Sequence, residues 1–164
     1  MSAPFVISRE FNAPRERVWK AWTEVEHLRR WFGPAGFAMT QCKLDLRPGG
    51  IFHYALRGPD GNEMWGKWVF REIVAPERIS LVNSFSDAAG GITRHPMAPA
   101  WPREMLSTTT FAEKGGKTVL TLEWKPINAT PEEIATFEGG RPGMTQGWTG
   151  TMDQLTNYLS KEMS

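Results

Sequence analysis

The residue types that most often perform catalysis or bind metals are few and scattered in this chain of 164 residues. The histidines, His27, His53 and His95, show no HExxH or other metal-ligand spacing, and no Asp/Glu cluster completes a site. Cys42 lies in a strand-like stretch beside Leu44, which is typical of a small buried hydrophobic residue. No GxSxG, GxGxxG or P-loop motif occurs. We therefore predict no metal, no cofactor and no catalytic residue.

A few polar side chains could still face an interior cavity. Tyr54 alternates with Phe52, and a buried phenol needs a hydrogen-bond partner. Glu72 would point to the same side of its strand as Trp68, provided that no bulge intervenes. Burial there would raise its pKa and make it a candidate acid or base. The alternative is that Glu72 ends its strand in solvent. Asn83 and Thr109 complete this polar set.

Aromatic residues are the most unusual feature of the composition, with eight Trp and nine Phe against two Tyr. Any one of these rings could be ordinary core, but as a set on one concave face they favour an apolar pocket. The predicted ligand-binding residues are Phe52, Tyr54, Trp68, Phe70, Phe85, Thr109, Phe111, Trp148 and Met152. The predicted cavity mouth consists of Trp31, Phe32, Met97 and Trp101.

The elements that must position these residues follow from periodicity. A strand over 4–12 precedes two short helices, the second started by a capping box over 23–26 and ended by Gly33 and Pro34. From residue 37 onward, period-two segments separated by Gly/Pro turns predict about six more strands, with a long Pro/Gly-rich loop over roughly 87–102. The end of the chain is predicted to be helical from about Thr130, with interruptions at Gly139-Gly140 and Pro142-Gly143.

The last helix, predicted over roughly 143–161, carries Trp148, Met152, Leu155 and Leu159 on one face. Gly147 and Gly150 lie beside that face, and we interpret them as keeping the helix thin where it approaches the sheet. Hairpin-connected strands form an antiparallel sheet with one apolar face, which this helix would cover. The predicted fold class is α+β, with a curved antiparallel sheet of six or seven strands wrapped around a long C-terminal helix.

Length and charge limit the remaining choices. The chain is long enough for one domain spanning 1–164, and a net charge of +1 gives no basis for binding nucleic acid or an acidic membrane surface. No stretch has the length and apolarity of a signal peptide or a membrane span. With one cysteine, the chain is expected to be cytoplasmic. The sequence leaves open whether the chain forms a homodimer.

Several strings resemble those of the START-like (SRPBCC) superfamily. NAPRERVWKAWTEVEHLRRWFGP is similar to its opening helices. LDLRPGGIFHYALRGPDG, WGKWVFREIVAPERI and the late GW…L…YL helix narrow the resemblance to the branch of the activator of heat-shock-protein-90 ATPase homologues, C-terminal-domain type. The resemblance implies a helix-grip fold with an internal hydrophobic cavity. The co-chaperones of that branch carry an additional N-terminal domain, and this chain begins at the START-like module, so a chaperone partner is not expected.

Three functions remain as hypotheses. The first is a binding module for a lipid-like or ring-containing small molecule. The second is a cyclase- or dehydratase-type enzyme in which Glu72 or Tyr54 handles a proton. The third is a co-chaperone-type interaction module that uses the outer surface, which a closed interior would favour.

Overall fold

The structure is a computed structural model that describes residues 3–33, 36–95 and 98–162. Seven strands form one antiparallel sheet in the order β1-β8-β7-β5-β4-β3-β2, and a two-residue strand, β6, pairs with β5. The strands are β1 (Phe5–Phe11), β2 (Ala38–Leu44), β3 (Ile51–Arg57), β4 (Glu63–Val74), β5 (Arg78–Ser86), β6 (Ile92–Thr93), β7 (Glu104–Lys114) and β8 (Lys117–Ile127). The predicted antiparallel sheet is confirmed, and β6 lies within the stretch predicted to be a loop.

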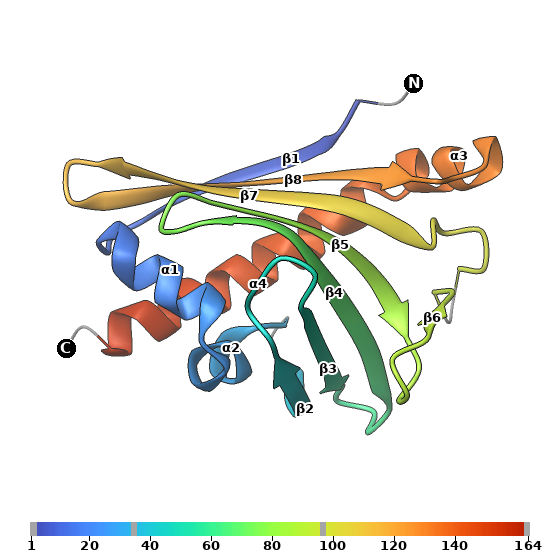
Figure 1. Ribbon diagram of the computed structural model, residues 1–164, viewed down its shortest axis with the longest axis horizontal. Helices are drawn as coiled ribbons and strands as arrows, with labels where there is room; N and C mark the ends of the chain where they lie inside the picture. Colours follow the sequence, from blue (N-terminus) through green and yellow to red (C-terminus); the bar gives the residue numbers. More distant parts are fainter. Residues whose placement is uncertain (1–2, 34–35, 96–97, 163–164) are drawn as a thin grey trace.

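Four helices complete the fold: α1 (Arg15–Thr23), α2 (Val25–Trp31), α3 (Pro131–Gly139) and α4 (Arg141–Glu162). The strongly bent sheet curves around α4, with α1 and α2 beside the C-terminal half of that helix and α3 near its beginning (Figure 1). The predicted α+β helix-grip architecture is therefore confirmed. Among the described residues, no helix has the length and apolarity needed to cross a membrane.

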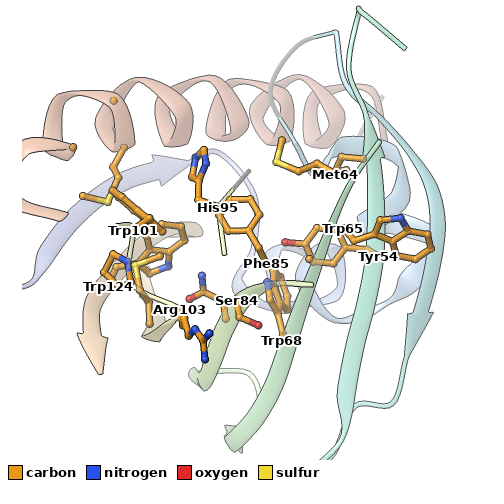
Figure 2. Close-up of a pocket in the computed structure, with 18 residues that line it drawn as sticks. Tyr54, Met64, Trp65, Trp68, Ser84, Phe85, His95, Trp101, Arg103 and Trp124 are labelled. Carbon is orange, nitrogen blue, oxygen red and sulfur yellow. The ribbon is translucent and has the colours of Figure 1, made fainter. Parts of the chain in front are cut away.

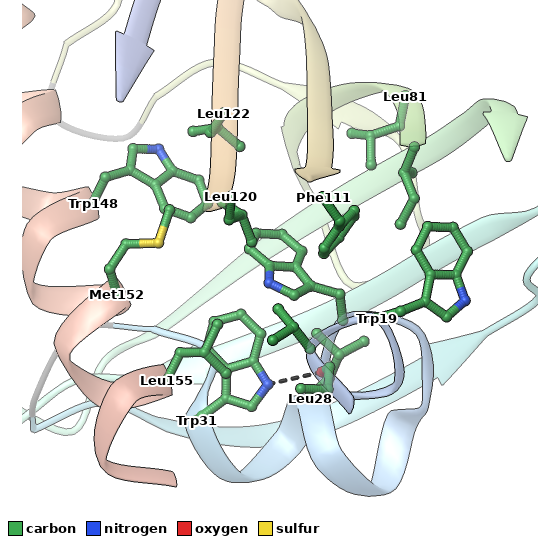
Figure 3. Packing of buried hydrophobic residues seen from close by; sticks show 14 of the residues in the cluster. Trp19, Leu28, Trp31, Leu81, Phe111, Leu120, Leu122, Trp148, Met152 and Leu155 are labelled. Carbon is green, nitrogen blue, oxygen red and sulfur yellow. Dashed lines mark hydrogen bonds between the residues drawn. The ribbon is translucent and has the colours of Figure 1, made fainter. Parts of the chain in front are cut away.

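The hydrophobic core fills the end of the sheet where α1, α2 and α4 meet (Figure 3). Trp148 of α4 stacks on Trp22 of α1 at 6.2 Å between ring centroids and makes an edge contact with Trp124 of β8 at 5.4 Å. Trp31 is 2% exposed and donates its indole N–H to the carbonyl oxygen of Ala21 at 2.8 Å. Rings from both short helices thus occupy this half of the concave face.

Two local predictions about helix ends are wrong. The capping box over 23–26 is absent, because α2 begins after Glu24 and the Thr23 hydroxyl instead donates to the carbonyl oxygen of Trp19 at 2.8 Å. A complete capping box occurs at α3, where Thr130 and Glu133 exchange side-chain and backbone hydrogen bonds. Pro142 does not interrupt the last helix, since it lies in the first turn of α4, where a missing N–H is tolerated.

The interpretation of Gly147 is also wrong. A Cβ atom added at Gly147 would meet no atom within 4 Å, so this glycine permits no close approach between helix and sheet. The predicted break near Gly140 is confirmed, because α3 ends at Gly139 and α4 begins at Arg141.

Candidate functional site

A pocket of about 440 Å³ lies at the end of the concave face that α1 and α2 do not fill (Figure 2). The sheet, the segment before β7 and the beginning of α4 all contribute to its wall. The lining residues are Tyr54, Leu56, Met64, Trp65, Gly66, Trp68, Asn83, Ser84, Phe85, His95, Trp101, Pro102, Arg103, Met105, Trp124, Gly140, Gly143 and Met144. Its volume is within the range of about 300–1,000 Å³ typical of small-molecule sites.

Strand register builds the sheet side of the pocket as two cross-strand rows. The first row pairs Tyr54 with Gly66 and Gly66 with Phe85. The second pairs Trp68 with Asn83, and Asn83 with Met105 on β7. Because directly opposed residues of a sheet project from the same face, each row presents its side chains together to the pocket.

Gly66 allows Tyr54 to lie flat across the sheet. A Cβ atom at Gly66 would be 2.8 Å from Tyr54 Cε2 and closer still to Cζ and the hydroxyl oxygen, so only a glycine fits beneath this ring. Burial raises the pKa of Tyr54 well above its ordinary value near 10. Tyr54 therefore presents a neutral hydroxyl at neutral pH.

A sequence of ring contacts runs from the sheet to the opposite wall. Phe85 and His95 lie 4.8 Å apart between ring centroids, His95 and Trp101 6.1 Å, and Trp101 and Phe137 5.8 Å. Burial lowers the pKa of His95, which favours its neutral imidazole. Trp101 packs against the junction between α3 and α4, where a Cβ atom at Gly140 would lie 2.7 Å from Trp101 Cζ3.

An ion pair fastens the segment that carries His95 and Trp101 to α3. Arg94 Nη1 donates to Glu133 Oε2 at 2.6 Å and to the carbonyl oxygen of Pro99 at 3.1 Å. The Glu133 side chain is 8% exposed, and its hydrogen bond from Arg94 is the main cause that lowers its pKa below the usual value. This partly buried pair fixes the outer wall of the pocket relative to α3.

Asn83 marks the deep end of the pocket. Its Oδ1 atom is buried and accepts no hydrogen bond from a described residue. Behind it lies a much smaller cavity of about 10 Å³, which shares Trp68, Asn83 and Trp124 with the main pocket. That volume is close to the minimum needed for one water molecule.

Only part of the predicted ligand-binding set lines the main pocket. Tyr54, Trp68, Phe85 and Trp101 line it, with Tyr54 and Trp68 facing Trp101 and Trp124 across the cavity (Figure 2). Thr109 and Trp148 line the small cavity instead. The remaining predicted residues, Phe52, Phe70, Phe111, Met152, Trp31 and Phe32, pack in or against the closed core, and Met97 lies outside the described residues. Alternation along the strands correctly placed Phe52, Phe70 and Phe111 on the concave face, but α1 and α2 fill half of that face.

The prediction of Glu72 as an inward acid or base is wrong. A register shift between Phe70 and Glu72 breaks the parity on which it depended. The Glu72 carboxylate is 51% exposed and pairs with Arg78 at 3.1 Å. In the described part of the chain, no group of three or more His, Cys, Asp or Glu side chains could hold a metal ion.

Several pocket residues were missed although a signal existed for some of them. Met64 and Gly66 continue the parity of Trp68, Leu56 continues that of Tyr54, and Trp124 continues the alternation of Leu120 and Leu122. Trp65, by contrast, stacks on His53 at 4.8 Å. The contributions from His95, Arg103, Gly140, Gly143 and Met144 depend on tertiary contacts that no local pattern indicates.

A bent antiparallel sheet around a long C-terminal helix, hollow at one end, defines the helix-grip class of START-like proteins. Within this class, the chain belongs to the family described as Activator of Hsp90 ATPase homolog 1-like protein, which it matches over residues 12–160. The resemblance seen in the sequence is thus confirmed. A comparison with curated protein sequences finds no match.

Solved structures from bacteria share the fold. Protein Ms6760 of Mycobacterium smegmatis is 27% identical with a TM-score of 0.77, and the alignment covers 94% of this chain and 88% of that one. A protein from Arthrobacter aurescens is 27% identical with a TM-score of 0.80, covering 97% and 87%. Protein NE0264 of Nitrosomonas europaea is 25% identical with a TM-score of 0.77, covering 98% and 96%.

Proposed function

We propose that this protein binds a hydrophobic small molecule, ring-containing or lipid-like, in the pocket of about 440 Å³ between the sheet and the beginning of α4. The pocket carries the proposal, because its aromatic and methionine-rich wall would remove apolar ligand surface from water at about 25 cal/mol per Å². Arg103 and Gly143 are both exposed, so the pocket reaches the surface and a ligand can enter.

The other two hypotheses have less support. The two residues suggested for proton transfer are poorly suited to it, because Glu72 is on the surface and burial raises the pKa of Tyr54. A closed interior was the feature expected of a purely surface-acting interaction module, and the pocket does not fit that expectation. The family description names an ATPase activator, but binding in the pocket requires no such partner.

Titration with the neutral fluorescent probe N-phenyl-1-naphthylamine tests the proposal. Gly143 lines the pocket and has open space at its Cβ position, so Gly143→Phe should fill the pocket without a backbone clash and weaken probe binding about tenfold or more. Gly139→Phe is the matched control, since Gly139 also has open space but does not line the pocket.

We expect saturable binding by the wild type and by Gly139→Phe, with loss of affinity only in Gly143→Phe. Absence of saturable binding in the wild type, or equal affinities in the two variants, would contradict the proposal. Melting temperatures of both variants establish that each remains folded.

A further inference from the structure

Resting on that proposed function, we infer that the ligand class is a hydroxylated hydrophobic acid, with its hydroxyl on Asn83 at the deep end of the pocket and its carboxylate on Arg103 at the rim. The apolar rings between these two residues would hold the hydrophobic body. Two features of the wall carry this inference independently.

The first feature is the unsatisfied acceptor. Asn83 Oδ1 is buried without a hydrogen-bond donor, and a buried acceptor left in that state costs about 1–3 kcal/mol. A ligand hydroxyl can donate to this oxygen, whereas an ether or a bare hydrocarbon cannot. The site should therefore distinguish a hydroxyl from a methoxy group at the same position.

The second feature is the charge of the pocket. Arg103 is exposed at the rim, and no ion pair or hydrogen bond joins its guanidinium to another described residue. No Asp or Glu belongs to the described lining, while Tyr54 and His95 favour their neutral forms. The described wall thus carries one formal charge, and it is positive. A guanidinium binds a carboxylate with two parallel hydrogen bonds, which favours an anion there.

The two groups lie close together along the pocket wall. Asn83 pairs with Met105, and Arg103 lies two residues before Met105, just before β7 begins at Glu104. Two residues of extended chain span at most about 7 Å, and the arginine side chain adds to this reach. A ligand lying along the pocket can reach both groups at once.

Three naphthalene probes separate these contributions: 6-hydroxy-2-naphthoic acid, 6-methoxy-2-naphthoic acid and 2-naphthol. Their dissociation constants are measured by tryptophan fluorescence and calorimetry at pH 7.5. We expect the hydroxy acid to bind about tenfold more tightly than either the methoxy acid or 2-naphthol, since each lacks one of the two polar contacts.

Variants assign each contact to its residue. Arg103→Gln should weaken both acids about five- to tenfold and leave 2-naphthol unchanged, whereas Arg71→Gln, at an exposed arginine outside the pocket lining, should change none of the three. Asn83→Leu should abolish the preference for hydroxyl over methoxy. Asn83→Ala serves the same purpose if the leucine variant has a lowered melting temperature.

The outcomes distinguish this inference from the proposed function. If 2-naphthol and N-phenyl-1-naphthylamine both fail to bind, the proposed function is wrong. If neutral probes bind but the acids bind no more tightly, or if Arg103→Gln affects acid and naphthol equally, the assignment of an acid is wrong. A hydroxyl preference that persists in both Asn83 variants overturns the role of Asn83.

Discussion

Replacing Gly66 with alanine tests how the pocket wall is built. The added Cβ atom would lie 2.8 Å from Tyr54 Cε2 and closer still to Cζ and the hydroxyl oxygen. These distances are shorter than van der Waals contact, and Tyr54 is the residue directly opposite Gly66 on β3. The backbone at Gly66 is paired on both sides, to Tyr54 on β3 and Phe85 on β5, so it cannot move away. The Tyr54 ring must leave its position instead.

The size of the effect follows from opposing contributions. Alanine in a strand interior should gain about 0.5–1 kcal/mol over glycine from backbone entropy. Overpacking costs about 1–3 kcal/mol, and contacts of 2.8 Å or less with the Tyr54 ring favour the upper part of this range. We expect Gly66→Ala to lower the free energy of unfolding by about 1–3 kcal/mol, or roughly 2–4 °C in melting temperature per kcal/mol for a chain of this length.

Urea denaturation of four variants, Gly66→Ala, Tyr54→Leu, their double variant and Gly147→Ala, provides the measurement. Gly147→Ala is the matched control, because its Cβ would meet nothing within 4 Å in a helix, and it should stabilise the protein by about 1 kcal/mol. Tyr54→Leu combined with Gly66→Ala should be less destabilised than the sum of the single changes, with a coupling of about 1 kcal/mol or more. A neutral or stabilising Gly66→Ala would refute the close-packed arrangement of Tyr54 on β4.

Three further outcomes are expected. Gly140→Ala should displace Trp101, because the new Cβ would lie 2.7 Å from its Cζ3 atom. The displacement should weaken binding of N-phenyl-1-naphthylamine and increase quenching of tryptophan fluorescence by acrylamide. Unchanged values for both would contradict the packing at Gly140. Trp148→Ala should lower the free energy of unfolding, measured by urea denaturation, by about 3–5 kcal/mol. The ring is 9% exposed and packs among Trp22, Trp124 and Phe32. A loss below about 2 kcal/mol would mean that it borders a larger cavity than the structure shows. Glu133 has a pKa lowered by Arg94, so its contribution to stability is present above its unfolded pKa near 4.5 and is lost as pH falls through the lower folded value. Glu133→Gln should therefore lose less stability than the wild type as pH falls below about 4.5, and parallel curves would exclude this contribution.

The strands and their inward faces could be predicted because each depends on nearby residues. Period-two alternation places Tyr54, Trp68 and Phe85 correctly on the concave face, and these three line the pocket. The final helix was also predictable, since Trp148, Met152, Leu155 and Leu159 lie on one helical face and all four are buried.

The position of a residue along the concave face could not be predicted. Phe52 and Tyr54 are two residues apart on β3, yet Phe52 is fully buried in the core while Tyr54 lines the pocket. The difference arises from the residue opposite each ring on β4: Phe52 opposes Trp68, at 4.8 Å between ring centroids, whereas Tyr54 opposes Gly66, which has no side chain. Parity indicates a face, but tertiary packing decides whether that face is filled.

Glu72 was misplaced for a different physical reason. The register shift between Phe70 and Glu72 changes which side chains point inward, and none of the residue types around it signals a bulge. The pocket wall that contains His95 and Trp101 was equally inaccessible, because the Arg94 to Glu133 ion pair that fixes it joins segments 39 residues apart.

The volume of the pocket requires that its space be open to solvent. A closed, dry cavity in a protein interior costs about 24 cal/mol per Å³, so 440 Å³ of such space would cost about 10 kcal/mol, as much as the whole stability of a typical domain. A chain of this size can contain that volume only where the space reaches solvent and carries groups that water or a ligand can satisfy. Arg103 at the rim, the Tyr54 hydroxyl and the buried Oδ1 of Asn83 supply those groups, and Gly66 and Gly140 hold two of the wall's aromatic rings against backbone instead of across the cavity. The same features that make the open space affordable in free energy are therefore those that would give a bound molecule its orientation.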